Sequence, residues 1–320
     1  MSPPTVSIII PCYNEERYVG AAIKSALDQT YEPTEVFVID DGSTDGSLDA
    51  IRSFDEQIVW RTGENRGACH ARNWGVKLAS GKFIKFLDAD DVLFEDAVQT
   101  QVNQVREISD DRVIVYGDGC DIREEGGRET SRTWTHARER REEEDALEYL
   151  IEVTPQTPLP LHRRSLIEEV GGFDERLPHF QDFDLHLRLC LSNIEFRYMP
   201  AKVAKFRCHE GRRITTTGHF ASDPKGRLRR IQRWVGMIRE EKRGGLTDSL
   251  GKCFAQHAWN GGRIALRNGD PELAREYFNY ASELHDECIA GNTPVYKWIV
   301  RLLGPEVAES IGNEVRSIKQ

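Results

Sequence analysis

The sequence lacks the patterns that mark several large classes of protein. It has no C-x-x-C pair, and its seven cysteines are scattered along the chain and odd in number. We therefore expect neither a disulfide framework nor a zinc site, and reduced thiols in a cytoplasmic protein. No apolar run approaches the roughly 18 residues that span a bilayer. The N-terminus has no basic residue before its short apolar run, which argues against a signal peptide.

Positive charge is also scarce. The chain has 43 Lys and Arg residues against 53 Asp and Glu, a net charge of -10, whereas nucleic-acid-binding proteins are usually basic. We expect no nucleic-acid partner. No G-x-G-x-x-G follows the first apolar run, which argues against a dinucleotide oxidoreductase. The acidic PCYNEE segment there lacks the Gly-rich loop and basic residue that a nucleotidyltransferase normally carries, and no H-E-x-x-H motif is present.

The first third of the chain alternates apolar runs with helical periodicity. Short runs rich in β-branched and aromatic residues predict buried strands at residues 6–10, 35–39, 58–60 and 83–87. Alternation with such short connections implies an α/β fold with parallel strands and right-handed crossovers. The polar loops after these strands then share one edge of the sheet, where ligands bind. We predict a crevice there containing Tyr13, Asp40, Asp41 and the acidic tetrad at residues 88–91.

The tetrad Asp88-Ala89-Asp90-Asp91 ends the fourth run. Three carboxylates packed this closely repel one another unless a cation or solvent intervenes. Oxygen-rich groups of this kind suit Mg²⁺ or Mn²⁺, which can in turn hold a diphosphate. Taken alone, the tetrad is equally typical of a solvated acidic turn that caps the next helix.

The rest of the chain is less regular until about residue 223. Residues 92–108 are predicted to be helical, and residues 123–146 to be a surface excursion without a hydrophobic period. From there we expect only helices, with Asp270-Pro271 as an N-cap and N1 pair. We therefore predict two domains, residues 1–222 and a helical region, residues 223–320. Apolar residues near Trp298 could meet a membrane surface, although packing on the first domain or on a second copy is favoured.

Three segments together resemble a known family. VSIIIPCYNEERYVGAAIKSALDQTY, EVFVIDDGSTDGS and NRGACHARNWGVKLASGKFIKFLDADD are similar to the family 2 glycosyltransferases, and the resemblance extends over residues 5–210. It implies the GT-A fold, a mostly parallel central sheet flanked by helices, here with the C-terminal helical appendage. It also implies transfer of a sugar from a nucleotide diphosphate donor, usually with inversion, and Mn²⁺ or Mg²⁺ as cofactor.

The resemblance also implies roles for individual residues. Tyr13 would stack on the base, Asp41 with support from Asp40 would accept the imide N–H of uracil, and Arg72 would either pair with the diphosphate or lock an acidic loop. The implied nucleotide-binding residues are Pro11, Tyr13, Glu15, Asp40, Asp41, Asn65, Gly67, Arg72, Asp88 and Ala89. The implied metal ligands are Asp88, Asp90, Asp91 and His209.

The general base of the family lies in an E-D pair before a D-L-x-L-R helix. The corresponding segment here is Gln181-Asp182-Phe183-Asp184-Leu185, so Asp182 is the candidate base and Asp184 its competitor. Gln181 departs from the pattern and removes a like charge that would raise the pKa of Asp182. On spacing alone, both aspartates would be helix caps.

The resemblance leaves the substrates open. The Asp40-Asp41 pair favours UDP over GDP, whereas dTDP shares the same imide. A glycan, a lipid-linked sugar or a protein is each a candidate acceptor, in the cytoplasm or at the inner face of the membrane. The helical region could also join two copies of the chain. The alternative function is a catalytically degenerate domain that binds sugars or partners, a reading that only Gln181 favours.

Overall fold

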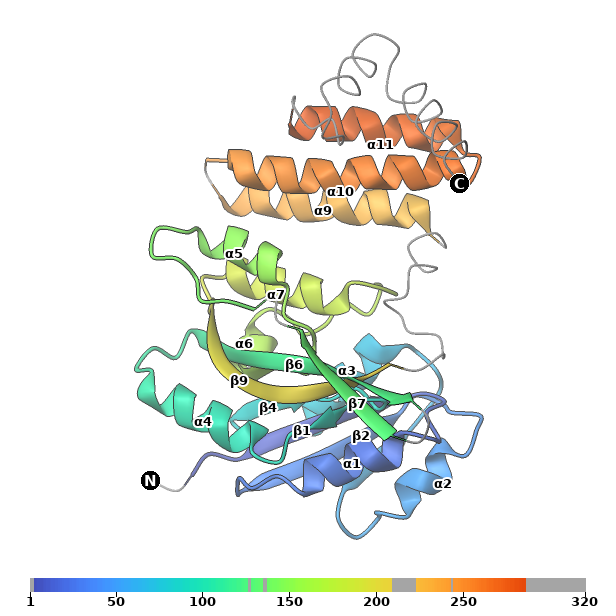
Figure 1. Cartoon of the computed structure of the whole chain (residues 1–320), viewed down its shortest axis with the longest axis vertical. Helices are drawn as coiled ribbons and strands as arrows, with labels where there is room; N and C mark the ends of the chain where they lie inside the picture. Colours follow the sequence, from blue (N-terminus) through green and yellow to red (C-terminus); the bar gives the residue numbers. More distant parts are fainter. Residues whose placement is uncertain (1–2, 126–127, 135–136, 209–222, 243, 286–320) are drawn as a thin grey trace. The chain divides into compact units, whose positions relative to one another are not determined.

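The computed structural model describes residues 3–125, 128–134, 137–208, 223–242 and 244–285 (Figure 1). The chain divides into two compact units, residues 1–210 and residues 211–320. The predicted boundary after residue 222 lies at the end of residues 209–222, a segment outside the described residues.

The first unit is built on a mixed sheet of nine strands flanked by helices. The strands are β1 (Val6–Cys12), β2 (Thr34–Asp40), β3 (Val59–Thr62), β4 (Phe83–Phe86), β5 (Val92–Leu93), β6 (Val113–Glu125), β7 (Arg128–Trp134), β8 (Pro160–Arg163) and β9 (Glu195–Arg207). The helices are α1 (Val19–Leu27), α2 (Ser47–Arg52), α3 (Ala68–Leu78), α4 (Ala97–Glu107), α5 (Ala146–Val153), α6 (Arg164–Glu169) and α7 (Gln181–Leu191).

The sheet order places β1 between β2 and β4. Strands follow the order β3-β2-β1-β4-β8-β6-β9-β5, with β7 paired to β6. The first four of these are parallel to one another, as the sequence predicted, whereas β8 runs antiparallel to both β4 and β6. The chain reverses its direction of travel across the sheet between β1 and β4. Such a reversal leaves a crevice at the carboxyl ends of the two strands, where α/β proteins bind ligands.

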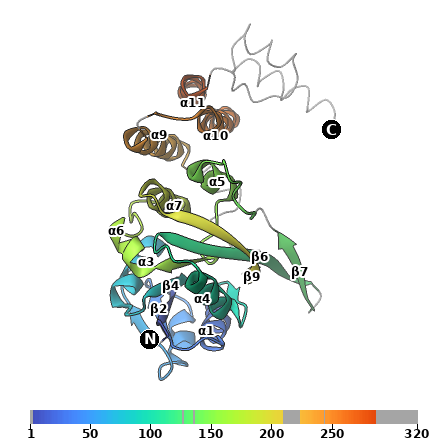
Figure 2. The same ribbon diagram turned by 90° about the vertical axis from the view of Figure 1, so that its left-hand side faces the viewer.

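Helices cover both faces of the sheet. Figure 2 shows α3, α6 and α7 on one side, with α1 and α4 on the other. The strands between them read as continuous apolar runs because both faces are buried, and every residue of β1 and β4 is buried. Lys85 is the charged residue in the otherwise apolar strand β4. Its Nζ donates to Gln101 Oε1 (2.7 Å) and to the Leu159 carbonyl (3.3 Å). Burial lowers the pKa of this amine well below its ordinary value.

Two segments differ from their predicted structures. Val92 and Leu93 form the short strand β5 against β9, and the helix begins only at Ala97. The predicted surface excursion at residues 123–146 begins as a hairpin instead, because β6 continues to Glu125 and pairs with β7. Helical and strand periodicity are equally weak in such polar sequence, and here the ladder that β6 already forms with β9 extends its strand.

The second unit contains α9 (Pro224–Glu241), α10 (Asp248–Arg267) and α11 (Pro271–Leu284). The predicted cap at Asp270 is confirmed, since its side chain accepts a hydrogen bond from the Leu273 amide. The helices α10 and α11 pack closely at Gly261, where a Cβ atom would lie 2.2 Å from Tyr277 Cε1. The predicted helix near Trp298 lies outside the described residues. Over the described part of the chain, no helix is both long enough and apolar enough to cross a membrane.

Candidate active site

The loops that follow β1 and β2 are tied to each other at the carboxyl edge of the sheet. Asn14 adopts a left-handed conformation (φ 55°), and its Oδ1 accepts a hydrogen bond from the Thr44 amide (2.8 Å). The Glu15 amide donates to Ser47 Oγ (2.8 Å), and Glu16 Oε2 accepts from the Gly46 amide (2.8 Å). These bonds fix the backbone beside Tyr13, whose side chain is 46% exposed. An exposed ring on a fixed loop is suited to stacking on a flat ligand.

Asp40 and Asp41 are buried at the end of β2 and stabilise different neighbours. Asp40 Oδ2 accepts a hydrogen bond from Thr62 Oγ1 (2.6 Å) at the end of β3. Asp41 accepts from the amides of Arg66 (2.9 Å) and Gly67 (2.7 Å), immediately before α3. Neither residue caps the following helix α2: Gly46 is its N-cap, and the Ser47 amide at its first residue donates to Asp45 Oδ1 (3.0 Å). Asp41 instead holds the turn that presents the N-terminus of α3.

Two glycines allow this turn to approach the loop after β2. Gly42 has φ +77°, and a Cβ atom there would lie 2.9 Å from both the Asn65 amide nitrogen and the Gly63 carbonyl oxygen. Gly67, the N-cap of α3, has φ +94°, a conformation that side-chain-bearing residues rarely adopt. Asn65 itself is exposed beside them. The absence of a side chain at Gly42 therefore allows the two loop backbones to approach closely.

Arg72 of α3 connects two parts of the predicted site. The side chain is 6% exposed and lies over the Phe173 ring, with its Cζ 5.3 Å from the ring centroid. Its Nη2 donates to Asp88 Oδ1 (2.6 Å), and its Nη1 donates to Gln181 Oε1 (2.7 Å). The guanidinium thus holds the first aspartate of the tetrad and the residue before Asp182 in fixed positions. Of its two expected roles, this geometry supports the lock on an acidic loop.

Asn73 was not among the predicted site residues, yet it holds the approach to α7. Its Oδ1 accepts from the Phe173 amide (2.8 Å), and its Nδ2 donates to the Phe173 carbonyl (2.9 Å). This reciprocal pair attaches the loop before α7 to α3. The Arg72-Asn73 pair in the sequence could have indicated this role. A side-chain amide carries both a donor and an acceptor, so it can pair with the N–H and the C=O of one backbone residue.

The acidic tetrad places its members in different surroundings. Asp91 is 5% exposed and accepts from the Arg207 amide (3.0 Å), so it holds β9, and Asp90 is partly exposed. Burial, together with the charges of Asp90, Asp45 and Asp88, raises the pKa of Glu15 to about 7. Among the described residues, no group of three or more His, Cys, Asp or Glu side chains is arranged to enclose an ion. Carboxylate oxygens are the type of ligand that hard divalent cations prefer.

Asp182 and Asp184 differ sharply at the start of α7. Asp184 is fully buried and pairs with Arg188 (2.8 Å), which is consistent with a structural role. Asp182 is partly exposed, and its Oδ1 accepts a bond from the next amide, that of Phe183 (2.8 Å). Desolvation raises the pKa of Asp182, and the positive charge of Arg72 opposes that rise. The preceding Phe180 has φ 60°, an uncommon conformation for an aromatic residue that recurs at functional sites.

Behind α7, two buried histidines face each other. His162 Nε2 and His186 Nε2 are 3.2 Å apart, and the rings are stacked at a centroid distance of 5.3 Å. Burial lowers the pKa of His186 to about 3 and that of His162 well below its ordinary value. Both rings are therefore neutral at physiological pH.

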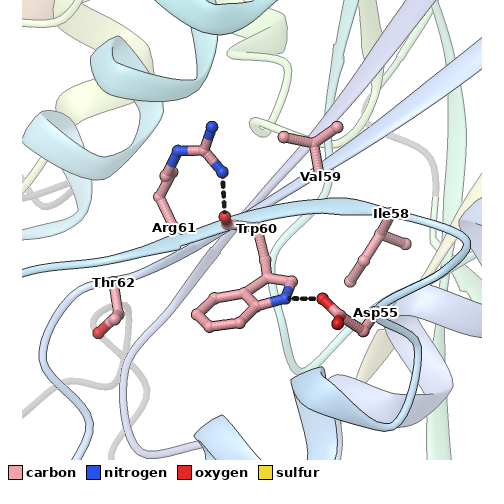
Figure 3. A pocket seen from close by; sticks show the side chains of 6 residues that line it. All are labelled: Asp55, Ile58, Val59, Trp60, Arg61 and Thr62. Carbon is pink, nitrogen blue, oxygen red and sulfur yellow. Dashed lines mark hydrogen bonds between the residues drawn. The ribbon is translucent and has the colours of Figure 1, made fainter.

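Most predicted residues within the described part gather at this edge, and two of them have apolar side chains that are buried. Pro11 is buried within β1 and Ala89 is buried beside Asp88, so each offers a ligand its backbone at most. His209 lies outside the described residues. A pocket of about 530 Å³ lies elsewhere, beside the edge strand β3, where Trp60 Nε1 donates to Asp55 Oδ1 at 2.6 Å (Figure 3). None of the predicted site residues lines it.

The sequence matches the family model described as Glycosyl transferase family 2 over residues 7–171, and the chain belongs to this family. The fold is the GT-A fold that the resemblance implied. An uncharacterized glycosyltransferase of Rickettsia typhi is 30% identical over 220 residues, which are 67% of this chain and 67% of that protein. One of Rickettsia bellii is 34% identical over 232 residues, 65% of this chain and 31% of that protein. The chain thus spans under a third of the latter relative.

A solved structure shares the fold. Residues 1–349 of S. aureus TarS, in complex with UDP-GlcNAc, superimpose with a TM-score of 0.70 and 17% sequence identity. The superposition covers 98% of this chain and 92% of the TarS chain. At this level of identity the likeness establishes the fold.

Proposed function

We propose that the chain is an inverting, metal-dependent glycosyltransferase that moves a sugar from a nucleotide diphosphate, with UDP favoured, to a hydroxyl group of a glycan, lipid-linked or protein acceptor. The observation that carries the proposal is the position of Arg72, which contacts Asp88 at the end of β4 and Gln181 beside Asp182. One side chain thereby joins the predicted donor side and the predicted base. We assign the reaction to residues 1–222, with residues 223–320 as a separate helical region.

The donor side supports a uridine nucleotide. Tyr13 offers an exposed ring at the end of β1, and the Asp41 carboxylate lies at the end of the neighbouring strand. Each Asp41 oxygen has already accepted one backbone N–H, which leaves one lone pair on each for an imide N–H. Uracil and thymine carry that donor between two carbonyl groups. Asp40 is the less accessible of the two, at 1% exposed against 5% for Asp41.

The carboxylates beside Glu15 would hold the cation, with Asp88 and Asp90 as its side-chain ligands. A divalent ion bound there would neutralise charge on the departing diphosphate. Asp91 contributes less directly, because its side chain already bonds to the Arg207 amide. Burial is the largest cause of the raised pKa of Glu15, and the negative charges of Asp90, Asp45 and Asp88 that add to it are ones that a cation would relieve.

Asp182 is the proposed general base. Inversion needs a carboxylate on the acceptor side that accepts the proton of the attacking hydroxyl. Asp182 is partly exposed, whereas Asp184 is enclosed and paired with Arg188, which separates the two candidates. Because Gln181 is neutral, it does not compete with Asp182 for the positive charge of Arg72. A glutamate at position 181 would compete for that charge and would repel the Asp182 carboxylate, so Asp182 ionises more readily beside Gln181.

The first experiment is calorimetric titration of the purified chain with UDP, GDP, dTDP and CDP, with and without Mn²⁺. We expect UDP or dTDP to bind more tightly with Mn²⁺, and Asp90→Ala to remove that metal dependence. Asp96→Ala is the matched control, because Asp96 is exposed nearby and its side chain caps nothing. Asp182→Asn should keep nucleotide binding and lose sugar transfer. Absence of binding by every nucleotide in both metal conditions would refute the proposed donor site.

A further inference from the structure

Asp118 of β6 and Asp88, which follows β4, lie toward the same edge of the sheet. In the antiparallel ladders of β8, His162 pairs with Ile84 and Leu161 pairs with Val115. Leu161 is therefore level with residue 85, so residues 115 and 85 are level. Asp118 and Asp88 each follow three residues later along strands that run in the same direction. Since neighbouring strands lie roughly 5 Å apart, the backbones at residues 85 and 115 are roughly 10 Å apart.

The side chain of Asp118 lies on the face of the sheet that carries α5 and α7. Tyr116, two residues earlier, meets the hydroxyl of Tyr149 on α5 at 2.5 Å. Tyr198 of β9 contacts both Tyr116 and Asp118. Its ring centroid is 5.7 Å from that of Tyr116, and its hydroxyl donates to Asp118 Oδ2 (2.8 Å). The proposed base Asp182 begins α7, which packs against α5. Asp118 and Asp182 therefore share one side of the sheet.

One oxygen of Asp118 has an unmet hydrogen-bonding requirement. Oδ1 is buried, and among the described residues it has no hydrogen-bond partner. A buried carboxylate oxygen without a donor is costly, and a water molecule or a ligand can supply the missing hydrogen bond. Burial raises the pKa of Asp118, while burial and Asp118 raise the pKa of Tyr198 to about 12, so the tyrosine hydroxyl keeps its proton.

The backbone around Asp118 is held rigidly. The register between β6 and β9 shifts between Tyr116 and Asp118 and again after Asp118, which marks a bulge. A Cβ atom at Gly117 would lie 2.4 Å from the Ala201 carbonyl oxygen, and one at Gly119 would lie 2.2 Å from Phe206 Cε2. Glycine on both sides thus lets β9 press against the bulge. Bulges of this kind often re-aim a side chain next to an active site.

We propose that Asp118 and Tyr198 form a subsite that binds the acceptor sugar, with Asp118 Oδ1 accepting a hydrogen bond from a sugar hydroxyl and the Tyr198 ring packing against the sugar. The inference rests on the proposed transfer reaction and adds a residue pair to its acceptor side. A carboxylate that accepts from hydroxyls beside an aromatic ring is a chemistry suited to carbohydrates. Tyr198 keeps Asp118 Oδ2 occupied, which leaves the buried Oδ1 as the oxygen that still needs a donor.

The test is saturation-transfer NMR on the full chain with a panel of methyl glycosides of common hexoses and N-acetylhexosamines. We expect at least one glycoside to bind the wild type. Asp118→Ala should raise the dissociation constant of that glycoside roughly ten- to a hundredfold, the usual effect of losing a hydrogen bond to a charged group. Tyr198→Phe keeps the ring and should raise the dissociation constant several-fold. Asp110→Ala is the control, because Asp110 is exposed just before β6 and should bind as the wild type does.

The titration with UDP and Mn²⁺, run on the same samples, separates the two proposals. Glycoside binding requires no donor, so the subsite is decided even if every nucleotide fails to bind. A wild type that binds UDP but no glycoside overturns the subsite alone. Unchanged glycoside affinity in Asp118→Ala, or an equal loss of UDP affinity in that variant, also overturns it. If Asp118→Ala does not fold, Tyr198→Phe decides the question by the same measurements.

Discussion

Replacing Arg72 by alanine should destabilise the first unit much more than replacing Arg66, an arginine six positions earlier. Arg72 is 6% exposed and bonds to Asp88, to Gln181 and to the Phe173 ring. Removing one partner of a buried ion pair costs about 3–5 kcal/mol, and a cation–π contact contributes about 0.5–1 kcal/mol. The Asp88 side chain is 32% exposed and would remain partly hydrated, which lowers the loss. We expect about 2–4 kcal/mol.

The comparison with Arg66 supplies the control. Arg66 pairs with Glu175 at 3.4 Å, and its side chain is 59% exposed. Exposed pairs contribute about 0–1 kcal/mol, so Arg66→Ala should change the melting temperature by at most a few degrees. Arg72→Ala should lower it by roughly 4–16 °C, at about 2–4 °C per kcal/mol for a unit of this size. Calorimetric melting measures both. Equal shifts for the two variants would show that Arg72 does not bridge Asp88 and Gln181 in the folded chain.

Three further predictions follow from charge and packing. Gln181→Glu adds a negative charge beside Asp182 and raises the pKa of Asp182. The acid limb of the pH–rate profile should therefore move to higher pH. A profile that stays in place would contradict the role of Asp182 as the base. Gly261→Ala should cost about 1–3 kcal/mol in chemical denaturation of the helical unit, because its Cβ would lie 2.2 Å from Tyr277, whereas Gly236→Ala, with nothing within 4 Å, should be neutral or stabilising. Because the pKa of His186 is lowered to about 3 from 6.5, its stabilisation is present above pH 6.5 and is lost as the pH falls. The wild type should therefore lose about 2 kcal/mol more between pH 7 and pH 5 than His186→Phe does, and parallel curves would argue against a neutral buried ring.

The parallel half of the sheet and its loops could be predicted because each signal there is local. An apolar run predicts a buried strand, and the acidic residues directly after it predict where the strand ends. Asp40-Asp41 and the tetrad at residues 88–91 are the two examples. Parallel pairing then requires these ends to share an edge, whatever the distance along the chain. The helix cap at Asp270 is local in the same sense.

What could not be predicted depends on contacts between distant segments. The strand β6 runs on to Glu125 because β9 and β7 pair with it, and no periodicity in the polar sequence announces that pairing. Arg72 carried two plausible roles until Asp88 and Gln181 were placed beside it. The role of Asn73 could not be predicted because its partner, the Phe173 backbone, is 100 residues away. Asp118 gave no signal at all, since only the bulge and Tyr198 distinguish it from any surface aspartate.

The burial of Lys85 gives the protein an internal chemical reporter. Its amine has no exposed surface and lies in β4, directly before the segment that carries Asp88. Amine-reactive labels can reach it only when β4 separates from its neighbours, whereas lysines such as Lys24 on the surface of α1 react in the folded state. The ratio of labelling at these two positions therefore measures how often the strand beneath the candidate site opens. Such a ratio can be followed by mass spectrometry while donor, cation or acceptor is added, without introducing any probe into the sequence.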